Sequence, residues 1–472
     1  MVGIVSWGAY IPVYRLSRKK IAGVWGSQEA NGEKAVANFD EDSVTMAVEA
    51  VLDCTRGIDR SCIDGLFLAT TSAPYLEKAA SALVVTATDM SRQSRTADFS
   101  SSPRAGTNAV LSAVDAVRGG SAHHILVVAS DCRLGAAGGA MEQLLGNGAA
   151  ALLIGDEGVI ASIEGSYSAS EEVFDIWRLD SDRFVHMAEP RFTTAHYLST
   201  MQATISRLMT NHSLKMQDFS KVVFNAPDPR THTQLARALG LELKTQVQTP
   251  LFNTIGDIGA ASTLLMLVAA LEEAKPGERI LVANYGSGCD ILILQVTNAI
   301  TKLSPRRGVK GHLSIRRDLP SYEKALVFQN MIQTERERRP TPEAPSPILL
   351  LRERQAVIAL YGSRCRECRT VQYPPARVCV SCRAKDKMEG YRFSDKIATV
   401  FTFTKDYISL TPDPPTLEVV IDFQGGGRMV CALTDCDEGE IKIGMPVEMT
   451  FRRLYESKGI TNYFWKARPI RR

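Results

Sequence analysis

Two stretches of this sequence align with each other without a gap: Ala105–Ser130, AGTNAVLSAVDAVRGGSAHHILVVAS, and Ala260–Tyr285, AASTLLMLVAALEEAKPGERILVANY. Each begins as an apolar helix rich in small residues, passes through a short turn and ends in an apolar strand. Another short apolar strand precedes each copy, at Ile63–Ser72 and at Lys221–Pro227. The repeat predicts a duplicated α/β fold in which both faces of the strands are buried and the small residues let the helices pack closely between sheets.

The composition is that of an ordinary globular protein with more than one domain. The chain has 472 residues, of which 45% are hydrophobic, and a formal net charge of +3. This length predicts two or three domains, and the near-neutral charge argues against electrostatic binding of nucleic acid by the whole chain. No apolar run is long enough to span a bilayer, and the first residues have no basic region typical of a signal peptide. We therefore expect a cytoplasmic protein without a membrane partner.

Further motifs carry a resemblance to a known family. They are GIVSWGAYIPVYRLSRKKIAGVWG from residue 3, DEDSVTMAVEAVLD from residue 40, VFDIWR (Val173–Arg178), IGDIGAAS (Ile255–Ser262) and YGSG (Tyr285–Gly288). Over residues 1–301 the chain resembles the 3-hydroxy-3-methylglutaryl-CoA synthase family, especially its archaeal branch. The resemblance implies a five-layer αβαβα thiolase fold, an acyl-CoA substrate and a homodimer formed by this domain.

The positions at which that family carries its catalytic residues are changed. The family has a cysteine nucleophile before an AGT-like helix start, where this chain has Ser102 or Pro103. The glutamate position is occupied by Thr71 in ATTS, and the histidine position by Asn225 in FNAP. Asp257 replaces the asparagine of a related GN motif. These changes predict that the family reaction, condensation of acetyl-CoA with acetoacetyl-CoA, fails.

A covalent acyl-enzyme is not expected at Ser102. A serine hydroxyl needs a strong base beside it, whereas a cysteine thiolate forms readily, and Asn225 cannot accept a proton at neutral pH. A reaction that needs only an enolate and a base, such as an aldol addition or a retro-aldol cleavage of an acyl-CoA, could proceed without the cysteine.

Candidate residues for such a reaction come from the family positions. Ser287 matches a backbone N–H contact to the thioester oxygen, and Asp257 is the best-placed base. Tyr285 and Tyr75 are candidate hydroxyl donors. The structural alternatives are that Asp257 caps the following helix and that both tyrosines only pack.

The composition changes after residue 301. Residues 302–347 comprise an amphipathic helix, expected over Tyr322–Glu335, and a charged, proline-rich linker, Glu335–Pro347. We place the next domain from residue 348.

Four clustered cysteines give the clearest chemical signal in the chain: Cys365, Cys368, Cys379 and Cys382. Each Cys-x2-Cys pair can supply two thiolates from one turn, and two such turns complete a tetrahedral zinc site. Four-cysteine sites are closed, so we predict one structural zinc rather than a catalytic one. The alternative is a set of free thiols. Cys431 and Cys436 do not fit this spacing, and Cys54, Cys62, Cys132 and Cys289 are expected to be buried thiols.

Short strands follow the cysteines, expected at Lys396–Thr404, Thr416–Phe423, Arg428–Thr434, Pro446–Phe451 and in NYFWKARPI near the end of the chain. Turns containing Gly and Pro separate them, which predicts a small barrel of the OB-fold type. We assign the zinc ribbon to residues 348–392 and the OB-fold to residues 393–472. This region is similar to zinc-ribbon and OB-fold proteins that accompany thiolase-type acyl-CoA enzymes, which implies contact with CoA and a possible complex with another thiolase or a hydratase.

An OB-fold with a zinc ribbon is also a common nucleic-acid module, and Arg452, Arg453, Lys466, Arg468, Arg471 and Arg472 are basic. The adjoining acyl-CoA domain favours CoA as the ligand, so we do not expect a nucleic-acid partner. Three functional hypotheses remain: an acyl-CoA enzyme that makes or cleaves a carbon–carbon bond without a cysteine nucleophile, a non-catalytic CoA-binding or scaffolding partner of a thiolase or hydratase, and a synthase-like acyltransferase.

Overall fold

The computed structural model describes residues 1–28, 31–332 and 343–471. The chain divides into two compact units. The α/β unit comprises Met1–Ala37, Asp42–Val85 and Met90–Ala325, and the C-terminal unit comprises Leu326–Arg472 together with the short segments Asn38–Glu41 and Thr86–Asp89. The domain boundaries that we proposed from the sequence, after residues 301, 347 and 392, remain a proposal.

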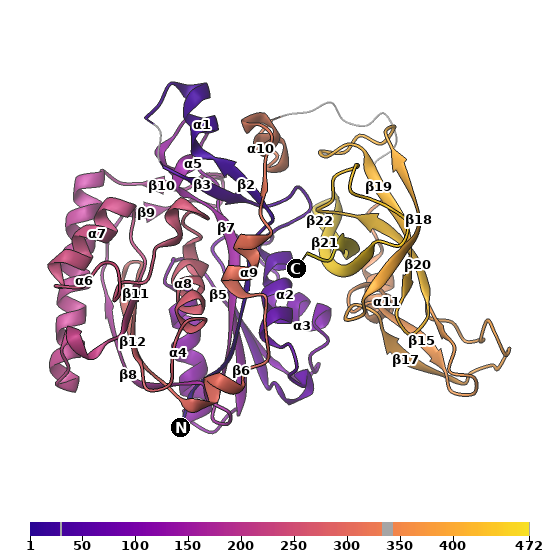
Figure 1. Cartoon of the computed structure of the whole chain (residues 1–472), viewed down its shortest axis with the longest axis horizontal. Helices are drawn as coiled ribbons and strands as arrows, with labels where there is room; N and C mark the ends of the chain where they lie inside the picture. The colour runs from indigo at the N-terminus through magenta and orange to yellow at the C-terminus, as the bar shows by residue number, and fades with distance from the viewer. Residues whose placement is uncertain (29–30, 333–342, 472) are drawn as a thin grey trace. The chain divides into compact units, whose positions relative to one another are not determined.

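A long mixed sheet forms the centre of the α/β unit (Figure 1). Its strands from the first half of the unit are β1 (Gly3–Tyr10), β4 (Gly65–Ala69), β5 (Arg95–Phe99), β6 (His124–Cys132) and β7 (Asn147–Gly155). Its strands from the second half are β8 (Ala161–Ser170), β11 (Lys221–Phe224), β12 (Arg279–Tyr285) and β13 (Gly288–Val296). They lie in the order β11-β12-β13-β8-β1-β7-β6-β4-β5.

The two halves of this sheet repeat the same strand pattern outward from the point where β1 meets β8. In the first half β7 and β6 pair antiparallel, and β4 and β5 follow in parallel. In the second half β13 and β12 pair antiparallel, β11 follows in parallel, and Val247 bridges β11 in parallel where β5 would stand. The duplication predicted from the sequence repeat is therefore confirmed.

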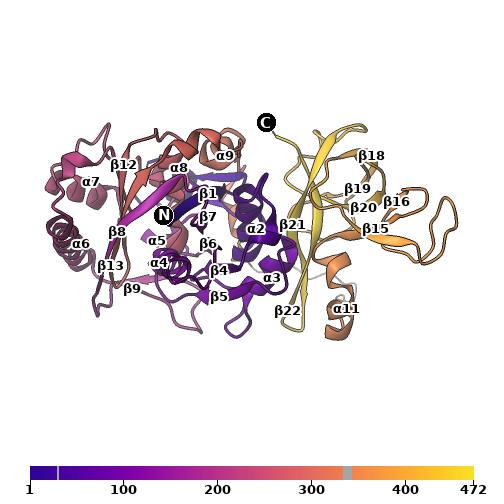
Figure 2. The ribbon, with the colours of Figure 1, turned by 90° about the horizontal axis from the view of Figure 1, so that it is seen from below.

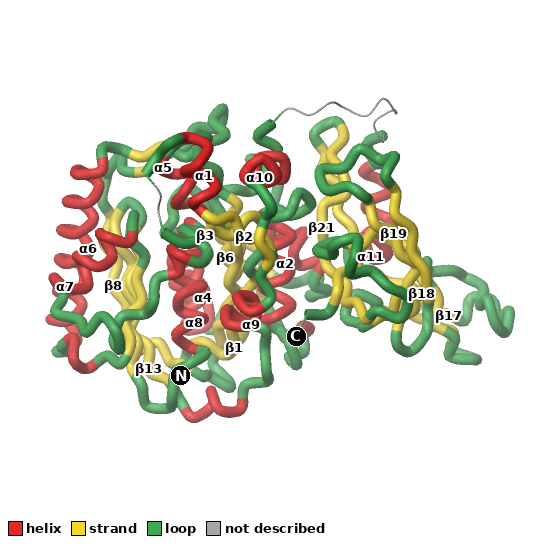
Figure 3. The backbone as a smooth tube through the Cα atoms, turned by 45° about the horizontal axis from the view of Figure 1, so that its top comes forward, coloured by secondary structure: helices red, strands yellow, loops and turns green. Residues whose placement is uncertain are grey.

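The repeated helices, α4 (Ala105–Arg118) and α8 (Ser262–Leu271), contact each other in the middle of the unit (Figure 3). Every residue of α8 is buried. Small residues are needed at their contact, because a Cβ atom added at Gly106 would overlap the carbonyl oxygen of Ala260. The prediction that small side chains let these helices approach closely is correct.

Outer helices complete a five-layer arrangement in the described part of the α/β unit (Figure 2). The strands of the first half form one β layer, which α2 (Ser43–Cys54) covers on its outer side through contacts with β1, β6 and β7. The strands of the second half form the other β layer, which α6 (Pro190–His212) covers through contacts with β8, β12 and β13. The helix α7 (Pro229–Ala238) packs on α6. The predicted αβαβα architecture is thus confirmed.

Shorter elements surround these layers. They are β2 (Tyr14–Ser17), α1 (Arg18–Trp25), β3 (Glu33–Val36), α3 (Ala80–Ala87), α5 (Ala140–Leu144), β9 (Ile176–Trp177), β10 (His186–Met187), α9 (Gly308–Ser314), β14 (Arg317–Asp318) and α10 (Tyr322–Phe328), with 3-10 turns η1 (Arg60–Cys62), η2 (Met216–Asp218), η3 (Leu251–Asn253), η4 (Gly259–Ala261) and η5 (Asn298–Lys302). The helix expected over Tyr322–Glu335 was predicted too long. It ends at Phe328 because Asn330 adopts a left-handed conformation, with φ of 51°. Residues 333–335 of that prediction, and most of the predicted linker, lie outside the described residues.

The C-terminal unit contains a ribbon and a barrel. The helix α11 (Pro347–Val357) precedes a small sheet of β16 (Val371–Gln372), β15 (Tyr361–Cys365) and β17 (Met388–Arg392), in that order. A closed barrel follows, in the order β18-β19-β20-β22-β21. Its strands are β18 (Ala398–Asp406), β19 (Thr416–Phe423), β20 (Arg428–Leu433), β21 (Pro446–Ser457) and β22 (Ile460–Pro469).

The barrel agrees closely with the strands expected from the sequence. Its interior is apolar, and Phe451 and Trp465 are completely buried. The turn between β19 and β20 is made by Gly425–Gly427, all with φ between 89° and 106°, which only glycine adopts at little cost. None of the helices in the described residues is long and apolar enough to cross a membrane.

Candidate functional site

The four clustered cysteines converge at the ribbon. Their sulphur atoms all lie within 4.8 Å of one another, with 3.6 Å between Cys365 and Cys382 and 3.5 Å between Cys368 and Cys379. Tetrahedral Zn–S bonds of about 2.3 Å require sulphur atoms slightly less than 4 Å apart, so the set fits zinc.

Both Cys-x2-Cys turns have the same local structure. The residue after the second cysteine of each pair, Arg369 or Arg383, has φ of 63°. Its N–H donates to the carbonyl of the first cysteine, at 3.0 Å in one turn and 3.2 Å in the other. Two equivalent turns facing each other therefore bring the sulphur atoms together, as the spacing predicted.

The other cysteines are not all buried as expected. Cys54 and Cys289 are buried, and burial raises the pKa of the Cys54 thiol to about 12. Cys62 is exposed and Cys132 is half-buried. The prediction was wrong for these two because apolar sequence neighbours do not determine burial in a surface 3-10 turn or at the end of a strand.

The candidate catalytic residues lie in loops that follow strands of the central sheet. Thr71 follows β4, Ser102 follows β5, Asn225 follows β11 and Ser287 follows β12. Within each half the parallel strands end at the same edge, and the hydrogen bond from Ser102 to the carbonyl of Gly286 brings a loop of the first half to a turn of the second. Asp257 comes from the segment before α8 and is paired with Arg133, from the loop after β6.

Ser102 links the two halves of the unit. Its Oγ donates to the carbonyl of Gly286 at 3.0 Å and accepts from the N–H of Arg104 at 3.1 Å. The hydroxyl proton is thus directed to a backbone carbonyl, which is too weak a base to generate an alkoxide. The expectation that Ser102 is not an activated nucleophile stays a prediction.

Asn225 holds the end of β12. Its Nδ2 donates to the carbonyl of Tyr285 at 2.9 Å, and its Oδ1 accepts from the N–H of the same residue at 2.8 Å. The side-chain amide therefore pairs with the backbone as a neighbouring strand would. An imidazole could not make both bonds in this way, so the arrangement suits the asparagine found here.

Asp257 has both a capping contact and an ion pair. Its Oδ1 accepts from the N–H of Gly259 at 3.0 Å and from the hydroxyl of Ser262 at 2.7 Å. Its Oδ2 lies 3.3 Å from a guanidinium nitrogen of Arg133. The side chain is 21% exposed, so a ligand can reach it.

Thr71 is bound to an aspartate that the sequence analysis did not single out. Asp131, fully buried at the end of β6, accepts from the Thr71 N–H at 2.7 Å and from the Thr71 hydroxyl at 2.9 Å. It also accepts from Thr70, Ser72 and the N–H of Ala260. A carboxylate at the end of an otherwise apolar strand was the available sequence signal.

Tyr285 faces the outer layer of helices. Its ring packs against Tyr197 of α6, with 5.1 Å between ring centroids, and its side chain belongs to the apolar cluster beneath that helix. Among the described residues its hydroxyl has no hydrogen-bond partner. Burial, and next the nearby Asp175 carboxylate, raise the pKa of Tyr285 far above its ordinary value.

The next residue back along β12, Asn284, faces α4. Its side chain donates to the hydroxyl of Thr107 at 3.1 Å and to the carbonyl of Pro103 at 3.3 Å. The alternation of side chains along a strand therefore places Asn284 beside the loop of Ser102 and Pro103, and Tyr285 on the other face. This argues for the packing role of Tyr285.

Ser287 occupies the turn between β12 and β13. It is exposed and has φ of 48°, and the following Gly288 has φ of 113°. A Cβ atom at Gly288 would overlap the carbonyl of Ala169, so the turn needs glycine there. The tight turn fixes the direction of the backbone at Ser287, the feature on which an oxyanion contact depends.

A cavity and a cleft adjoin at this site. A cavity is lined by Asn225, Ala226, Leu251, Phe252, Gly256, Asp257, Ile258, Ser262 and Met266. A larger cleft, of about 420 Å³, lies beside it, with Thr71, Tyr75, Pro103 and Arg133 among its lining residues. Asp257 lines the cavity and Arg133 lines the cleft, so this ion pair lies where the cavity and the cleft adjoin.

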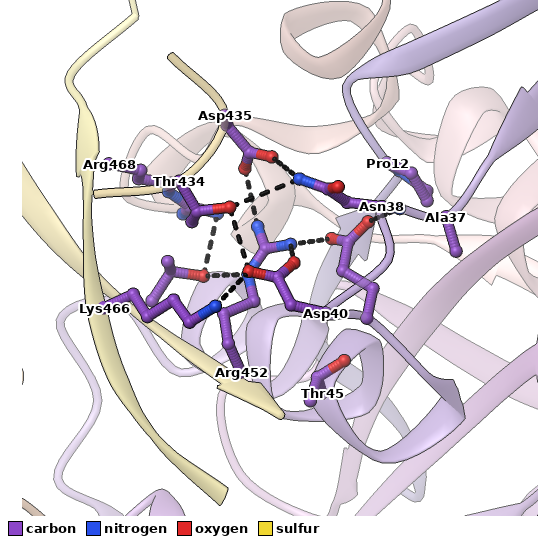
Figure 4. A network of polar contacts seen from close by, with 12 residues as sticks. Pro12, Ala37, Asn38, Asp40, Thr45, Thr434, Asp435, Arg452, Lys466 and Arg468 are labelled. Atoms are coloured by element: carbon purple, nitrogen blue, oxygen red, sulfur yellow. Dashed lines mark hydrogen bonds and ion pairs between the residues drawn. The ribbon is translucent and has the colours of Figure 1, made fainter. Parts of the chain in front are cut away.

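Two of the basic residues considered for nucleic-acid binding are buried inside the C-terminal unit (Figure 4). Arg452 pairs with Asp40 at 3.1 Å, Glu41 at 2.8 Å and Asp435 at 2.6 Å. Lys466 pairs with Asp40 at 2.8 Å. Although burial alone would raise it, the Lys466 and Arg452 charges lower the pKa of Asp40. These two basic side chains are therefore internal partners of carboxylates.

Two protein-family models match the C-terminal part of the chain. The rubredoxin-like zinc ribbon domain of ChsH2 matches residues 356–389, and the C-terminal OB-fold domain of ChsH2 matches residues 391–452. The predicted four-cysteine zinc ribbon and OB-fold are confirmed by these matches and by the geometry above.

Curated relatives match the α/β part. The hydroxymethylglutaryl-CoA synthase of Caldivirga maquilingensis is 34% identical over 296 residues, covering 61% of this chain and 85% of that protein. The synthase of Methanopyrus kandleri is 33% identical over 314 residues, covering 64% of this chain and 89% of that protein.

Solved structures share the fold. An HMG-CoA synthase complexed with CoA has a TM-score of 0.62 at 21% identity, covering 69% of this chain and 89% of that one. A beta-ketoacyl-[acyl carrier protein] synthase III from Thermus thermophilus has a TM-score of 0.57 at 19% identity, covering 63% and 99%.

Proposed function

This chain belongs to the hydroxymethylglutaryl-CoA synthase family, and from that premise we propose that it acts on a CoA thioester by making or cleaving a carbon–carbon bond without a covalent acyl-enzyme. The proposed chemistry is an aldol addition or its reverse. The proposed ligand is an acyl-CoA, since one structural neighbour is complexed with CoA. We further propose a cytoplasmic homodimer, with a possible second partner of the thiolase or hydratase type.

The hydrogen bonding of Ser102 is the observation that supports this proposal. The residue stands where the family resemblance places the nucleophile, and its hydroxyl donates to the carbonyl of Gly286 at 3.0 Å. Among the described residues that line the cavity or the cleft, none is a cysteine. A reaction that avoids acyl transfer to the protein is therefore favoured over the family's condensation.

The remaining groups can serve such a reaction. In the cleavage direction a base takes the proton of a 3-hydroxyl group, the bond between C2 and C3 breaks, and an aldehyde or ketone leaves. The thioester enolate that remains is then protonated at C2. Asp257 is our candidate base, and the Ser287 N–H together with Arg133 would stabilise the enolate oxygen. In this scheme Thr71 and Asn225 position the loops, and Tyr285 packs beneath α6.

A non-catalytic, CoA-binding or scaffolding role is the second candidate. The observation that favours it is that Ser102, Asn225 and Thr71 are all engaged in contacts within the protein. In that case the site would hold a thioester without transforming it.

The two candidates are separated by product analysis. The purified protein would be incubated with 3-hydroxyacyl-CoA thioesters, and the release of a carbonyl compound and a shortened acyl-CoA followed by mass spectrometry. Asp257→Asn should lower turnover at least about a hundredfold, the usual scale for a general base, with little effect on binding. The exposed Asp115 of α4 offers a matched control, Asp115→Asn. Binding without any product, or a labelled acyl group attached to the protein, would contradict the proposed reaction.

A further inference from the structure

We propose that the cleft beside the Arg133–Asp257 pair binds a bulky apolar acyl group, so that the substrate is a medium-chain or cyclic acyl-CoA and not acetyl-CoA. The inference rests on the proposed acyl-CoA chemistry and adds the class of acyl group. It follows from the position and volume of the cleft and from the large apolar side chains in its walls.

The cleft opens directly onto the reacting positions. Thr71 and Pro103, which stand where the family has its glutamate and next to where it has its cysteine, both line it. Arg133 lines it as well and contacts Asp257 at 3.3 Å. A thioester carbonyl held near these groups would therefore have its acyl chain in the cleft.

The cleft is much larger than an acetyl group needs. Its volume of about 420 Å³ is in the range of sites for whole small-molecule ligands. About half of its lining is apolar, and the large apolar side chains in it are Tyr75, Leu76, Phe99, Ile176, Trp177 and Val185. Filling this space with apolar carbon instead of water would be favourable.

Three charged groups of the cleft are engaged with the protein. Asp98 accepts from the N–H groups of Ala80 and Ser81, at 3.1 and 2.9 Å. Arg178 donates to the carbonyl of Thr71 at 2.7 Å, and Arg133 is paired with Asp257. These three groups therefore already have partners within the protein.

Large apolar side chains at the cleft face water. Leu76 is 83% exposed and Trp177 is 37% exposed. The Trp177 ring stacks on His186 across the β9–β10 hairpin, at 5.7 Å between centroids, and contacts Phe174 edge-on. Exposed apolar side chains held in place in this way are typical of a binding surface.

Calorimetry with decanoyl-CoA and acetyl-CoA tests the proposal without requiring turnover. The intact protein should bind decanoyl-CoA at least roughly tenfold more tightly than acetyl-CoA, because several methylene groups leave water. Ala73→Trp, which fills the cleft, should remove most of that preference and leave acetyl-CoA affinity within about twofold. Ala203→Trp, at an exposed position of α6, is the matched control.

A second variant protects the test against a folding defect. Trp177→Ala removes a wall of the cleft from a surface hairpin and should weaken decanoyl-CoA binding several-fold, again with acetyl-CoA unaffected. Equal affinity for the two thioesters, or unchanged decanoyl-CoA affinity in both cleft variants, would overturn the proposal. Selective decanoyl-CoA binding without bond cleavage would support the apolar acyl group and contradict the proposed reaction. Bond cleavage without a preference for the longer chain would support the proposed reaction and contradict the apolar acyl group.

Discussion

Asn225 and Ser102 both hold backbone groups where β12 ends. Asn225 binds the N–H and the carbonyl of Tyr285, the last residue of β12, and Ser102 binds the carbonyl of Gly286 in the turn that follows. Ser287 lies in the same turn, and an oxyanion contact requires donors fixed in advance. These contacts thus fix the backbone beside the Ser287 N–H, the group that the proposed reaction needs.

Lys34 is a buried base whose titration should be visible in stability. Its Nζ donates to the carbonyl of Glu142 at 2.5 Å, and Arg18, Glu142 and Cys132 are the charged or titratable groups near it. Burial lowers the pKa of Lys34 from 10.5 to about 8. Between these pH values the unfolded chain holds the proton and the folded chain does not, so stability should rise with pH in this window.

Lys34→Met should remove that rise. The difference between the two proteins in free energy of unfolding should change by about 3 kcal/mol between pH 8 and pH 10.5, as followed by urea unfolding. Lys19→Met, at an exposed position of α1, should leave the pH dependence unaltered. A difference that does not vary with pH across this window would contradict the assignment.

At the scale of the element, the contact of α4 with the segment before α8 depends on Gly106. A Cβ atom there would overlap the carbonyl oxygen of Ala260, and this backbone cannot move without shifting α8, which is buried throughout. Gly106→Ala should therefore destabilise the fold by about 1–3 kcal/mol, the usual cost of overpacking a core. Denaturant unfolding measures it.

Gly23, unlike Gly106, has room for a side chain. It lies in α1, and a Cβ atom added there would meet nothing within 4 Å. Gly23→Ala should stabilise by up to about 1 kcal/mol, because alanine loses less backbone freedom in a helix. A destabilised Gly23→Ala, or an unaffected Gly106→Ala, would disagree with the packing described.

The zinc ribbon is an element held by its metal. Purified protein should contain about one equivalent of zinc, and Cys379→Ser should lose it and unfold the ribbon, since structural zinc contributes folding energy directly. Elemental analysis together with limited proteolysis measures both effects. Cys436→Ser, which alters a buried cysteine outside the cluster, should keep the metal. A folded ribbon without metal would exclude this role.

At the scale of the whole molecule, the edge strand β5 suits the homodimer that we propose. It is the last strand of the sheet and pairs only with β4 among the described strands, and Arg95, Thr96 and Asp98 are exposed. An unpaired strand edge is a ready partner for a second copy. Light scattering should give twice the chain mass of 51.7 kDa, about 103 kDa.

Thr96→Asp should shift that mass toward the monomer, because a charge on the edge opposes strand pairing. A substitution of similar size on an outer helix, Ser199→Asp in α6, is the control. A wild-type chain that is monomeric at micromolar concentration would contradict the dimer.

Parts of this protein could be predicted from the sequence because their causes are local. The gapless repeat of helix, turn and strand predicted duplication, and the topology of the sheet repeats in the same way about β1 and β8. The spacing of Cys365, Cys368, Cys379 and Cys382 predicted a zinc site, since each pair of sulphur atoms comes from one turn. The barrel strands were predicted from alternating residues bounded by glycine and proline.

Other features were decided only by the tertiary structure. Asp131 binds Thr71 and Ala260 from distant parts of the chain, and Arg452 is buried because Asp40, Glu41 and Asp435 come together around it. The cleft exists because loops after β4 and β5 meet the β9–β10 hairpin. Periodicity and spacing report what neighbouring residues do to one another. Whether a charge is buried, a hydroxyl engaged or a space left open depends on which remote segments meet, and folding alone determines that.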